Sequence, residues 1–246
     1  MRIIYITLRG LLQSYGVDDC WDDRRTVSCP TKSAVIGMIG AALGLAYGDE
    51  RLGYLTEHLK ISVRQNNTVE KIVDYQIIRA HRTPDKDYMH PPFFIPQRTM
   101  TKADGSNDEF KFDKEFKTDK WIPSTPKQRN KEYLAGASFT VFVEGEDNLL
   151  QEIHDALLNP VFPLFLGRKG CLPSEPIVGR FIDCCSIEEA WETCDAKDND
   201  MHIVEYDDDG QNEIGTEHFS RRDNIYGNYV YTSRKICRKE IRTRCI

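Results

Sequence analysis

Apolar residues gather in short blocks along this chain, and the spacing inside each block predicts a strand or a helix. The opening block, RIIYITLRGLL at residues 2–12, is rich in β-branched side chains and predicts a buried strand. Further blocks bounded by turn-forming residues predict strands at 59–65, 133–145, 161–167, 176–184, 202–207 and 228–236. The chain therefore carries enough strands for a sheet.

Two segments have the period of an amphipathic helix. The first begins after a cap at Thr31 or Ser33 and is expected to stop at Gly48. Small residues recur in it at helical spacing and predict a face that packs closely on a sheet: Gly37, Gly40, Ala41 and Gly44. The second helix is predicted at residues 147–160, with an apolar side made of Leu149, Leu150, Ile153, Leu157 and Leu158.

The pattern changes between residues 78 and 132, where charges and prolines replace the regular apolar spacing. Such a segment cannot build a compact core alone, and it predicts an extended, thumb-like arm inserted into a folded domain. The domain itself is assigned to residues 1–77 and 133–246, with a C-terminal β-rich extension from about residue 185.

The predicted elements follow one another as strand, helix, strand, arm, strand, helix and strand. This β-α-β-β-α-β order predicts an α+β protein with a ferredoxin-like (RRM-like) palm that the arm interrupts. Because this fold hosts many functions, the function has to be read from the site.

Charge is distributed unevenly along the chain, whose net charge is −6. Residues 183–217 hold 13 acidic residues against one lysine, whereas residues 218–246 hold eight basic residues against two acidic ones. One interpretation is a solvated acidic loop beside a basic edge. The other is a protein that presents separate faces to a protein partner and to RNA.

Neither a catalytic motif nor a metal motif is present in the sequence. None of the six histidines has zinc-protease spacing, and there is no glycine–serine elbow or Walker loop. The eight cysteines contain no C-x-x-C pair, which favours reduced structural thiols. We therefore predict no catalytic residue, no cofactor and no metal. No apolar block is long enough to cross a membrane, so the protein is expected to be cytoplasmic.

Two loops are candidates for binding phosphate. Thr31, Lys32 and Ser33 open the first helix, where unpaired N–H groups and the helix dipole favour an anion. Arg24 and Arg25 precede them in the same loop. An ordinary helix cap with an exposed lysine is the alternative interpretation.

The second loop lies in PVFPLFLGRKGCLP, at residues 160–173. Gly167 and Gly170 let the backbone approach a ligand closely, and Arg168 and Lys169 would face that ligand. In the predicted fold the two loops could converge on one anion. A surface turn with two solvated cations is the alternative.

The arm supplies a third group of candidates, because its cations alternate with aromatic residues. Cations bind phosphates and aromatic rings stack on bases, which suits single-stranded RNA. The cations are Arg79, His81, Arg82, Arg98, Lys127, Arg129 and Lys131. A solvated arm with a few anchoring aromatics is the alternative.

Several blocks resemble, in order, the CasD-like family of subunits from the type I-E CRISPR effector complex, Cascade, within the RAMP superfamily. The blocks are LQSYG, RRTVSCPTKSAVIGMIGAALG, DYQ, KEYLAGASFTVFV, NPVFPLFLGRKGCLPSEPI and, in the tail, YGNYVYTSR. The resemblance covers almost the whole chain. It implies a ferredoxin-like palm from which a thumb projects.

The resemblance implies a non-catalytic subunit that binds CRISPR RNA for antiviral defence. Such subunits hold the 5′ handle of the guide RNA, cap one end of the complex, and contact the backbone subunit CasC and the large subunit CasA. Target DNA is recognised by base pairing with the guide, so this chain would reach it only through the complex. Gly167, Arg168 and Lys169 would help to cradle the handle.

The alternative is a metal-independent endoribonuclease, like the related type I-C subunit that cuts CRISPR repeat RNA. That chemistry needs a base, a proton donor and a cation for the phosphate, for which His81, Tyr75 and Lys32 are candidates. The adjacent Lys-His pair of those nucleases has no counterpart, since residues 79–82 read Arg-Ala-His-Arg. An RNA-binding module unrelated to CRISPR is a third class.

Overall fold

The computed structural model describes residues 2–16, 23–78, 127–194, 200–207, 216–223 and 232–243. The chain divides into two compact units, one formed by residues 1–75 and 130–246 and the other by residues 76–129. Most of the second unit lies outside the described residues, so the arm predicted at 78–132 stays a prediction.

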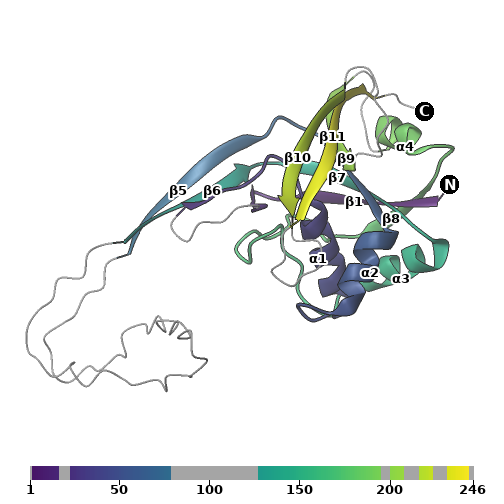
Figure 1. The fold of residues 1–246 in the computed structure, drawn as a ribbon, viewed down its shortest axis with the longest axis horizontal. Helices are drawn as coiled ribbons and strands as arrows, with labels where there is room; N and C mark the ends of the chain where they lie inside the picture. The colour runs from purple at the N-terminus through teal and green to yellow at the C-terminus, as the bar shows by residue number, and fades with distance from the viewer. Residues whose placement is uncertain are drawn as a thin grey trace, which may run out of the picture. The chain divides into compact units, whose positions relative to one another are not determined.

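The first unit is a mixed α+β structure built on one large antiparallel sheet (Figure 1). Its seven strands are ordered β10-β11-β9-β4-β7-β1-β8. They are β1 (Arg2–Arg9), β4 (Lys60–Gln65), β7 (Ser138–Glu144), β8 (Gly179–Asp183), β9 (Met201–Asp207), β10 (Thr216–Asp223) and β11 (Thr232–Arg242). The C-terminal strands therefore extend the same sheet that the N-terminal strand begins.

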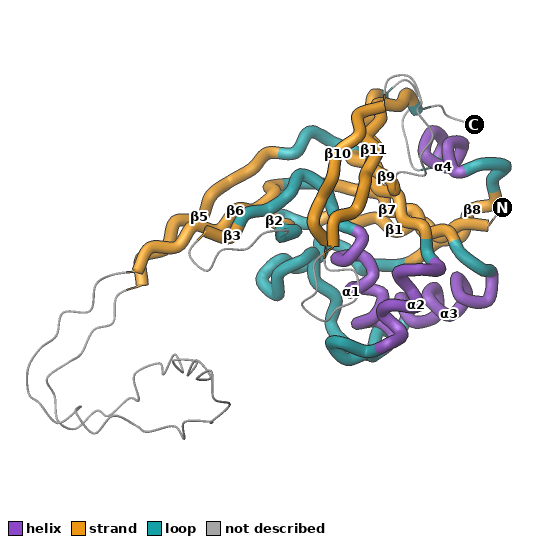
Figure 2. Tube along the Cα trace, in the orientation of Figure 1, coloured by secondary structure: helices purple, strands orange, loops and turns teal. Residues whose placement is uncertain are grey.

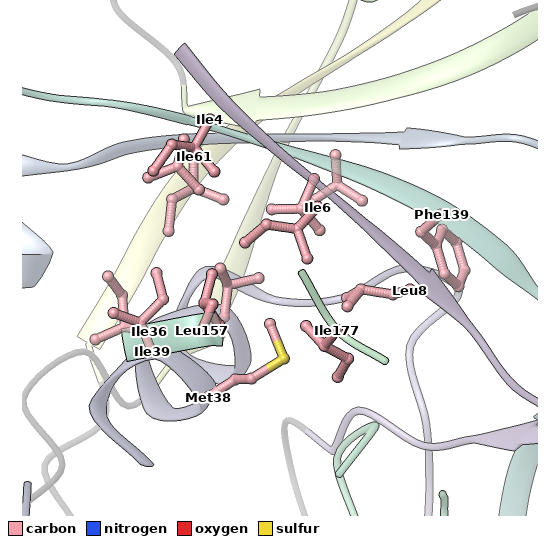
Figure 3. Close-up of a cluster of buried hydrophobic side chains, with 14 of the residues drawn as sticks. Ile4, Ile6, Leu8, Ile36, Met38, Ile39, Ile61, Phe139, Leu157 and Ile177 are labelled. Carbon is pink, nitrogen blue, oxygen red and sulfur yellow. The ribbon is translucent and has the colours of Figure 1, made fainter. Parts of the chain in front are cut away.

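Helices cover the sheet on both faces (Figure 2). Three of them, α1 (Lys32–Leu43), α2 (Glu50–His58) and α3 (Asp147–Leu158), gather on one face, and the short α4 (Ile187–Thr193) lies apart from them. The main core lies under the three helices, because alternate strand residues point toward them. Figure 3 shows Ile4, Ile6 and Leu8 of β1 in the same cluster as Ile36 and Ile39 of α1.

A second, smaller sheet stands beside the large one. Its strands are β2 (Leu12–Gln13), β3 (Asp23–Arg24), β5 (Glu70–Ile78) and β6 (Lys127–Ala135). Strand β6 pairs antiparallel with β2, parallel with β3, and also with β5. The single strand predicted at 133–145 is wrong, because the chain turns at Gly136, whose φ is 59°, between β6 and β7.

The buried strand predicted at 161–167 is also wrong. Val161 and Phe162 are 64% and 48% exposed, and the segment has no strand hydrogen bonds. Instead, their N–H groups donate to the carbonyl oxygens of Ala42 and Ala41, at distances of 3.0 and 3.1 Å. Because the last carbonyls of a helix lack partners within the helix, this segment completes the end of α1.

Both predicted helices form, with two corrections. Helix α1 is capped by Thr31 as expected but stops at Gly44, whose φ of 76° suits glycine, and not at Gly48. The small residues do not pack on the sheet: a Cβ on Gly40 would lie 2.6 Å from Leu52 Cδ2 of α2, one on Gly44 would lie 3.0 Å from Val161 Cγ1, and one on Gly37 would meet no atom within 4 Å. On α3, Leu158 is 49% exposed and does not belong to the apolar side.

Candidate functional site

The glycine loop, residues 167–170, is held tightly against the start of the chain. Gly167 has a φ of 90°, and a Cβ built on it would lie 1.8 Å from the Ser14 carbonyl oxygen. The Ser14 N–H donates to the Leu166 carbonyl at 3.1 Å, and the Cys171 N–H donates to the Arg168 carbonyl at 2.8 Å. Only glycine fits at position 167, so the loop has one defined backbone shape.

Arg168 fastens this loop to the smaller sheet. Its guanidinium donates to the carbonyl oxygens of Arg24 in β3, at 3.0 Å, and of Glu132 in β6, at 3.3 Å. It also lies over the Tyr133 ring, 5.2 Å from the ring centre. The side chain is half-buried. Arg168 was predicted to face a ligand, and the structure instead places it in contacts that join three segments of the chain.

Lys169 and Gly170 remain on the surface of the same loop. Both are exposed, and a Cβ on Gly170 would meet no atom within 4 Å. Arg25 lies on the neighbouring loop with 72% of its side chain exposed, and its Nε donates to Asp23 Oδ2 at 3.0 Å. We call residues 23–26 together with residues 167–170 the glycine-loop surface.

The loop at 23–26 is also held by hydrogen bonds to residues that were not predicted to belong to the site. The Thr26 N–H donates to Glu132 Oε2 at 3.0 Å, and the Tyr15 N–H donates to Thr26 Oγ1 at 2.8 Å. Lys71 of β5 donates to the Thr26 carbonyl at 2.9 Å. Nothing in the local sequence marks Glu132 for this role, since its partner is 106 residues away.

The start of α1 is capped by the Thr31 side chain. Thr31 Oγ1 accepts a hydrogen bond from the Ala34 N–H at 3.2 Å and lies 3.0 Å from Ser33 Oγ. Lys32 is only 9% exposed, and its Nζ lies 3.0 Å from Asp207 Oδ2 at the end of β9. The structure therefore brings Arg24 and Arg168 together as expected, whereas it commits Lys32 to the C-terminal strands.

The acidic and basic segments of the C-terminal region pair with each other. Glu205 of β9 lies 2.9 Å from Arg221 Nη2 of β10 and 2.5 Å from Arg238 Nη2 of β11. Asp207 likewise pairs with Arg234 of β11. Burial raises the pKa of Glu205, but Arg221 and Arg238 outweigh it and hold that pKa below the usual range.

The structure describes only some of the remaining predicted RNA-binding residues. Arg79, His81, Arg82 and Arg98 lie outside the described residues, as does the Lys127 side chain. Arg129 and Lys131 are half-buried along β6. Within the described ranges, no group of three or more His, Cys, Asp or Glu residues could hold a metal ion. No helix in that part of the chain is long and apolar enough to span a membrane.

Comparison with known proteins identifies the family of this chain. The family described as CRISPR-associated protein (Cas_Cas5) matches residues 3–227. The chain belongs to the Cas5 family. This confirms the Cas5 part of the resemblance seen in the sequence blocks, and its assignment to type I-E stays a prediction.

Known relatives agree with the assignment to Cas5. The chain is 27% identical over 190 residues to the CRISPR system Cascade subunit CasD of Escherichia coli (strain K12), covering 76% of this chain and 72% of CasD. Its fold is similar to a chain of a CRISPR RNA-guided surveillance complex, with a TM-score of 0.65, 23% identity, and 99% and 90% of the two chains covered. A structure titled "Crystal structure of Cas protein" matches with a TM-score of 0.62, 23% identity, and coverage of 98% and 95%.

Proposed function

We propose that this Cas5 protein is a subunit of a type I-E CRISPR complex, Cascade, and that its glycine-loop surface holds the 5′ handle of the guide RNA. The observation that carries the proposal is the Cas5 match over residues 3–227, together with the similarity to CasD. By this proposal the chain caps the complex beside CasC and CasA, in the cytoplasm, and meets target DNA only through the guide.

The geometry of the glycine-loop surface supports this role. Lys169 and Arg25 are exposed cations carried by loops whose backbones are fixed by Gly167, Arg168 and Thr26. Binding to a preformed site costs less conformational entropy than binding to a flexible one. Exposed cations of this kind neutralise phosphates, which gives affinity that falls as salt rises.

The strand order supports a ferredoxin-like palm. Strands β1 and β4 are joined through α1 and α2 and lie on either side of β7. Strands β7 and β8 are joined through α3 and lie on either side of β1. A ferredoxin-like palm would have two interleaved β-α-β units of this kind, so the strand order supports that part of the proposal. In this scheme the residues predicted as an arm would form the thumb and press on the guide near the start of its spacer.

We also propose that the subunit does not cut RNA. In the alternative, Lys32 would stabilise a strained phosphate, but its side chain is only 9% exposed and its ammonium pairs with Asp207. Tyr75, the candidate proton donor, is 53% exposed on β5, and the candidate base His81 lies outside the described residues. The buried ion pair of Lys32 favours the scaffold over the nuclease.

Omission of this chain from the assembling complex tests the proposal. The other Cascade subunits and a CRISPR array are expressed with and without it, and the complex and its RNA are then analysed. We expect mature guide RNA to persist without this chain, while the complex loses CasA and leaves the handle accessible to nuclease. Disappearance of mature RNA in the presence of the dedicated processing nuclease would instead identify this chain as the ribonuclease.

A charge variant refines the test. The Lys169→Ala variant should weaken binding of handle RNA and reduce the slope of log affinity against log salt by about 1. Arg51→Ala is the matched control, because Arg51 is an exposed cation that pairs with Glu152 on α3, 2.8 Å away. Equal affinity of the two variants at every salt concentration would remove Lys169 from the RNA site.

A further inference from the structure

Glu132 places a carboxylate beside a surface that is expected to bind RNA phosphates. A negative charge opposes the binding of an anion, so the residue needs another physical role there. Its carbonyl accepts hydrogen bonds from Ser14 Oγ at 3.1 Å and from Arg168 Nη1 at 3.3 Å, and its side-chain Oε2 accepts from the Thr26 N–H at 3.0 Å. Glu132 on β6 is therefore bonded at once to the start of the chain, to the glycine loop and to the loop at 23–26.

The Glu132 side chain acts where the pairing of β3 with β6 ends. The two strands pair in parallel only at Asp23 and Arg24 of β3. Two residues later, Thr26 is 3% exposed, so its N–H needs an acceptor inside the protein. The carboxylate supplies that acceptor, and hydrogen bonds to an ionised acceptor are stronger than neutral ones. It therefore holds the loop beyond the last strand pair.

Arg25 lies between two anchored neighbours. The Arg24 carbonyl before it accepts from Arg168 Nη2 at 3.0 Å, and the Thr26 N–H after it donates to Glu132. The backbone on either side of Arg25 is thus held by hydrogen bonds from two different segments of the chain. One of those bonds depends on the Glu132 side chain.

The side chain of Arg25 stays on the surface although it pairs with Asp23. The exposed fractions of the two side chains are 72% and 38%, and surface pairs of this kind contribute little to stability. A phosphate can therefore take the place of the Asp23 carboxylate. Lys169 is the second exposed cation of the glycine-loop surface, and it follows Arg168, which also bonds to Glu132.

We propose that Glu132 is a positioning residue of the glycine-loop surface: its carboxylate acts through the Thr26 N–H to hold Arg25 on the same rigid frame as Lys169. Both cations can then meet phosphates of the handle without a further loss of backbone freedom, which lowers the cost of binding. The inference rests on the proposed function and deepens it. It gives the reason for a carboxylate in a surface that binds anions.

Substitutions that separate the reach of Glu132 from its charge test the proposal. Glu132→Gln keeps the length and an acceptor oxygen but removes the charge, whereas Glu132→Asp keeps the charge on a side chain that is too short. We expect Glu132→Gln to retain the affinity of the parent for handle RNA. Glu132→Asp should bind about fivefold more weakly, the cost of ordering one side chain on binding. Urea denaturation checks that both variants are folded. A Glu132→Asp variant that binds as the parent does would overturn the proposal.

Amide hydrogen exchange in the free chain tests the same contact without RNA. The Thr26 amide should exchange slowly in the parent and in Glu132→Gln, and about tenfold faster in Glu132→Asp, where its acceptor is out of reach. The Leu150 amide is the control, because it donates to the Glu146 carbonyl at 2.9 Å on α3 and should exchange equally in all three chains. Equal exchange of Thr26 in the three chains would refute the contact.

A double-mutant cycle shows whether Glu132 acts through Arg25. Arg25→Ala should weaken handle RNA less in Glu132→Asp than in the parent, because the arginine is already displaced there. Lys169→Ala should weaken it equally in both, since Arg168 bonds to the backbone carbonyl of residue 132, which the substitution keeps. Equal losses from Arg25→Ala in the two backgrounds would overturn the proposal.

Failure of this inference and failure of the proposed function can be told apart. A parent chain that binds no handle RNA and does not enter the Cascade complex would refute the proposed function. A parent that binds the RNA, with Glu132→Asp and Glu132→Gln variants of the same affinity, would refute the role of Glu132 alone.

Discussion

The glycine-loop surface and the C-terminal strands are both rich in charge, and they use it differently. Around the glycine loop, the guanidinium of Arg168 donates to two backbone carbonyls, and Lys169 next to it is exposed. In the C-terminal strands, Glu205 pairs with Arg221 and Arg238 inside the sheet. The first region therefore leaves positive charge exposed, whereas in the second region opposite charges pair and stabilise the sheet.

This difference shows that charged residues clustered in a sequence are not necessarily exposed to a binding partner in the folded protein. The acidic segment at 183–217 and the basic tail were open to an interpretation as two separate binding faces. For the pairs that the structure describes, the two segments are partners of each other across β9, β10 and β11. The predictions below separate structural charges from available ones.

Gly167→Ala should have the largest effect. The new Cβ would meet the Ser14 carbonyl oxygen at 1.8 Å, and the φ of 90° disfavours any side chain. We expect the free energy of unfolding to fall by about 5 kcal/mol or the chain not to fold, the range reserved for severe backbone conflicts. Urea denaturation measures it. Gly170→Ala is the control, because its Cβ enters open space, and a similar loss there would refute the rigid-loop account.

Glu205→Ala should come second. It would leave Arg221 and Arg238 without their shared carboxylate in a site where Glu205 is 6% exposed. Breaking a buried pair of this kind typically costs about 3–5 kcal/mol. The midpoint of urea denaturation would report it. Glu217→Ala is the comparison, since Glu217 is 76% exposed and lies 3.9 Å from Arg238, and it should change little.

The same carboxylate should make stability depend on acid pH. The pKa of Glu205 is lowered in the folded state, so the unfolded chain takes up the proton first as pH falls. The stabilisation is therefore complete above the unfolded pKa of about 4.3 and is lost as pH falls through the lower pKa of the folded state. Denaturation midpoints between pH 7 and pH 3 should decline more steeply in the parent than in Glu205→Gln. Parallel profiles would contradict the pairing.

The adjacent cations of the glycine loop should respond in opposite ways. Arg168→Ala removes two hydrogen bonds to carbonyls and should cost about 1–3 kcal/mol of stability, since hydrogen bonds of charged groups are the stronger ones. Lys169→Ala should leave stability within about 0.5 kcal/mol, as for other surface substitutions. Thermal unfolding and the affinity for handle RNA, both measured for the two variants, test this prediction. An unstable Lys169→Ala variant would mean that this lysine is structural too.

Much of the fold could be predicted because its strands and helices carry local patterns. The β-branched spacing of β1 and the amphipathic spacing of α3 are present in the sequence, and both elements formed where expected. The segment at 161–166 looked like a strand because it is apolar. Pro163 cannot donate to a strand ladder, and the N–H groups of Val161 and Phe162 donate to carbonyls at the end of α1. Strand β10 was missed because its sequence, TEHFSRRD at residues 216–223, is polar and has no apolar alternation.

The candidate site was predictable only in composition. The sequence located Gly167, Arg168 and Lys169, but it could not separate their roles, because those depend on contacts between distant segments. Arg168 reaches the Arg24 carbonyl 144 residues away, and Lys32 reaches Asp207 175 residues away. Local sequence patterns carry no information about such distant partners. The exposed Lys169 and the structural Arg168 therefore cannot be distinguished from the sequence alone.

The large sheet is open, so its edge strands could pair with those of other copies of the chain at high concentration. Its edges among the described strands are β10 and β8. Strand β10 carries the exposed Glu217, and β8 carries the exposed Arg180 and Asp183. Charged edges resist the addition of a foreign strand. We therefore expect the free chain to resist edge-to-edge aggregation.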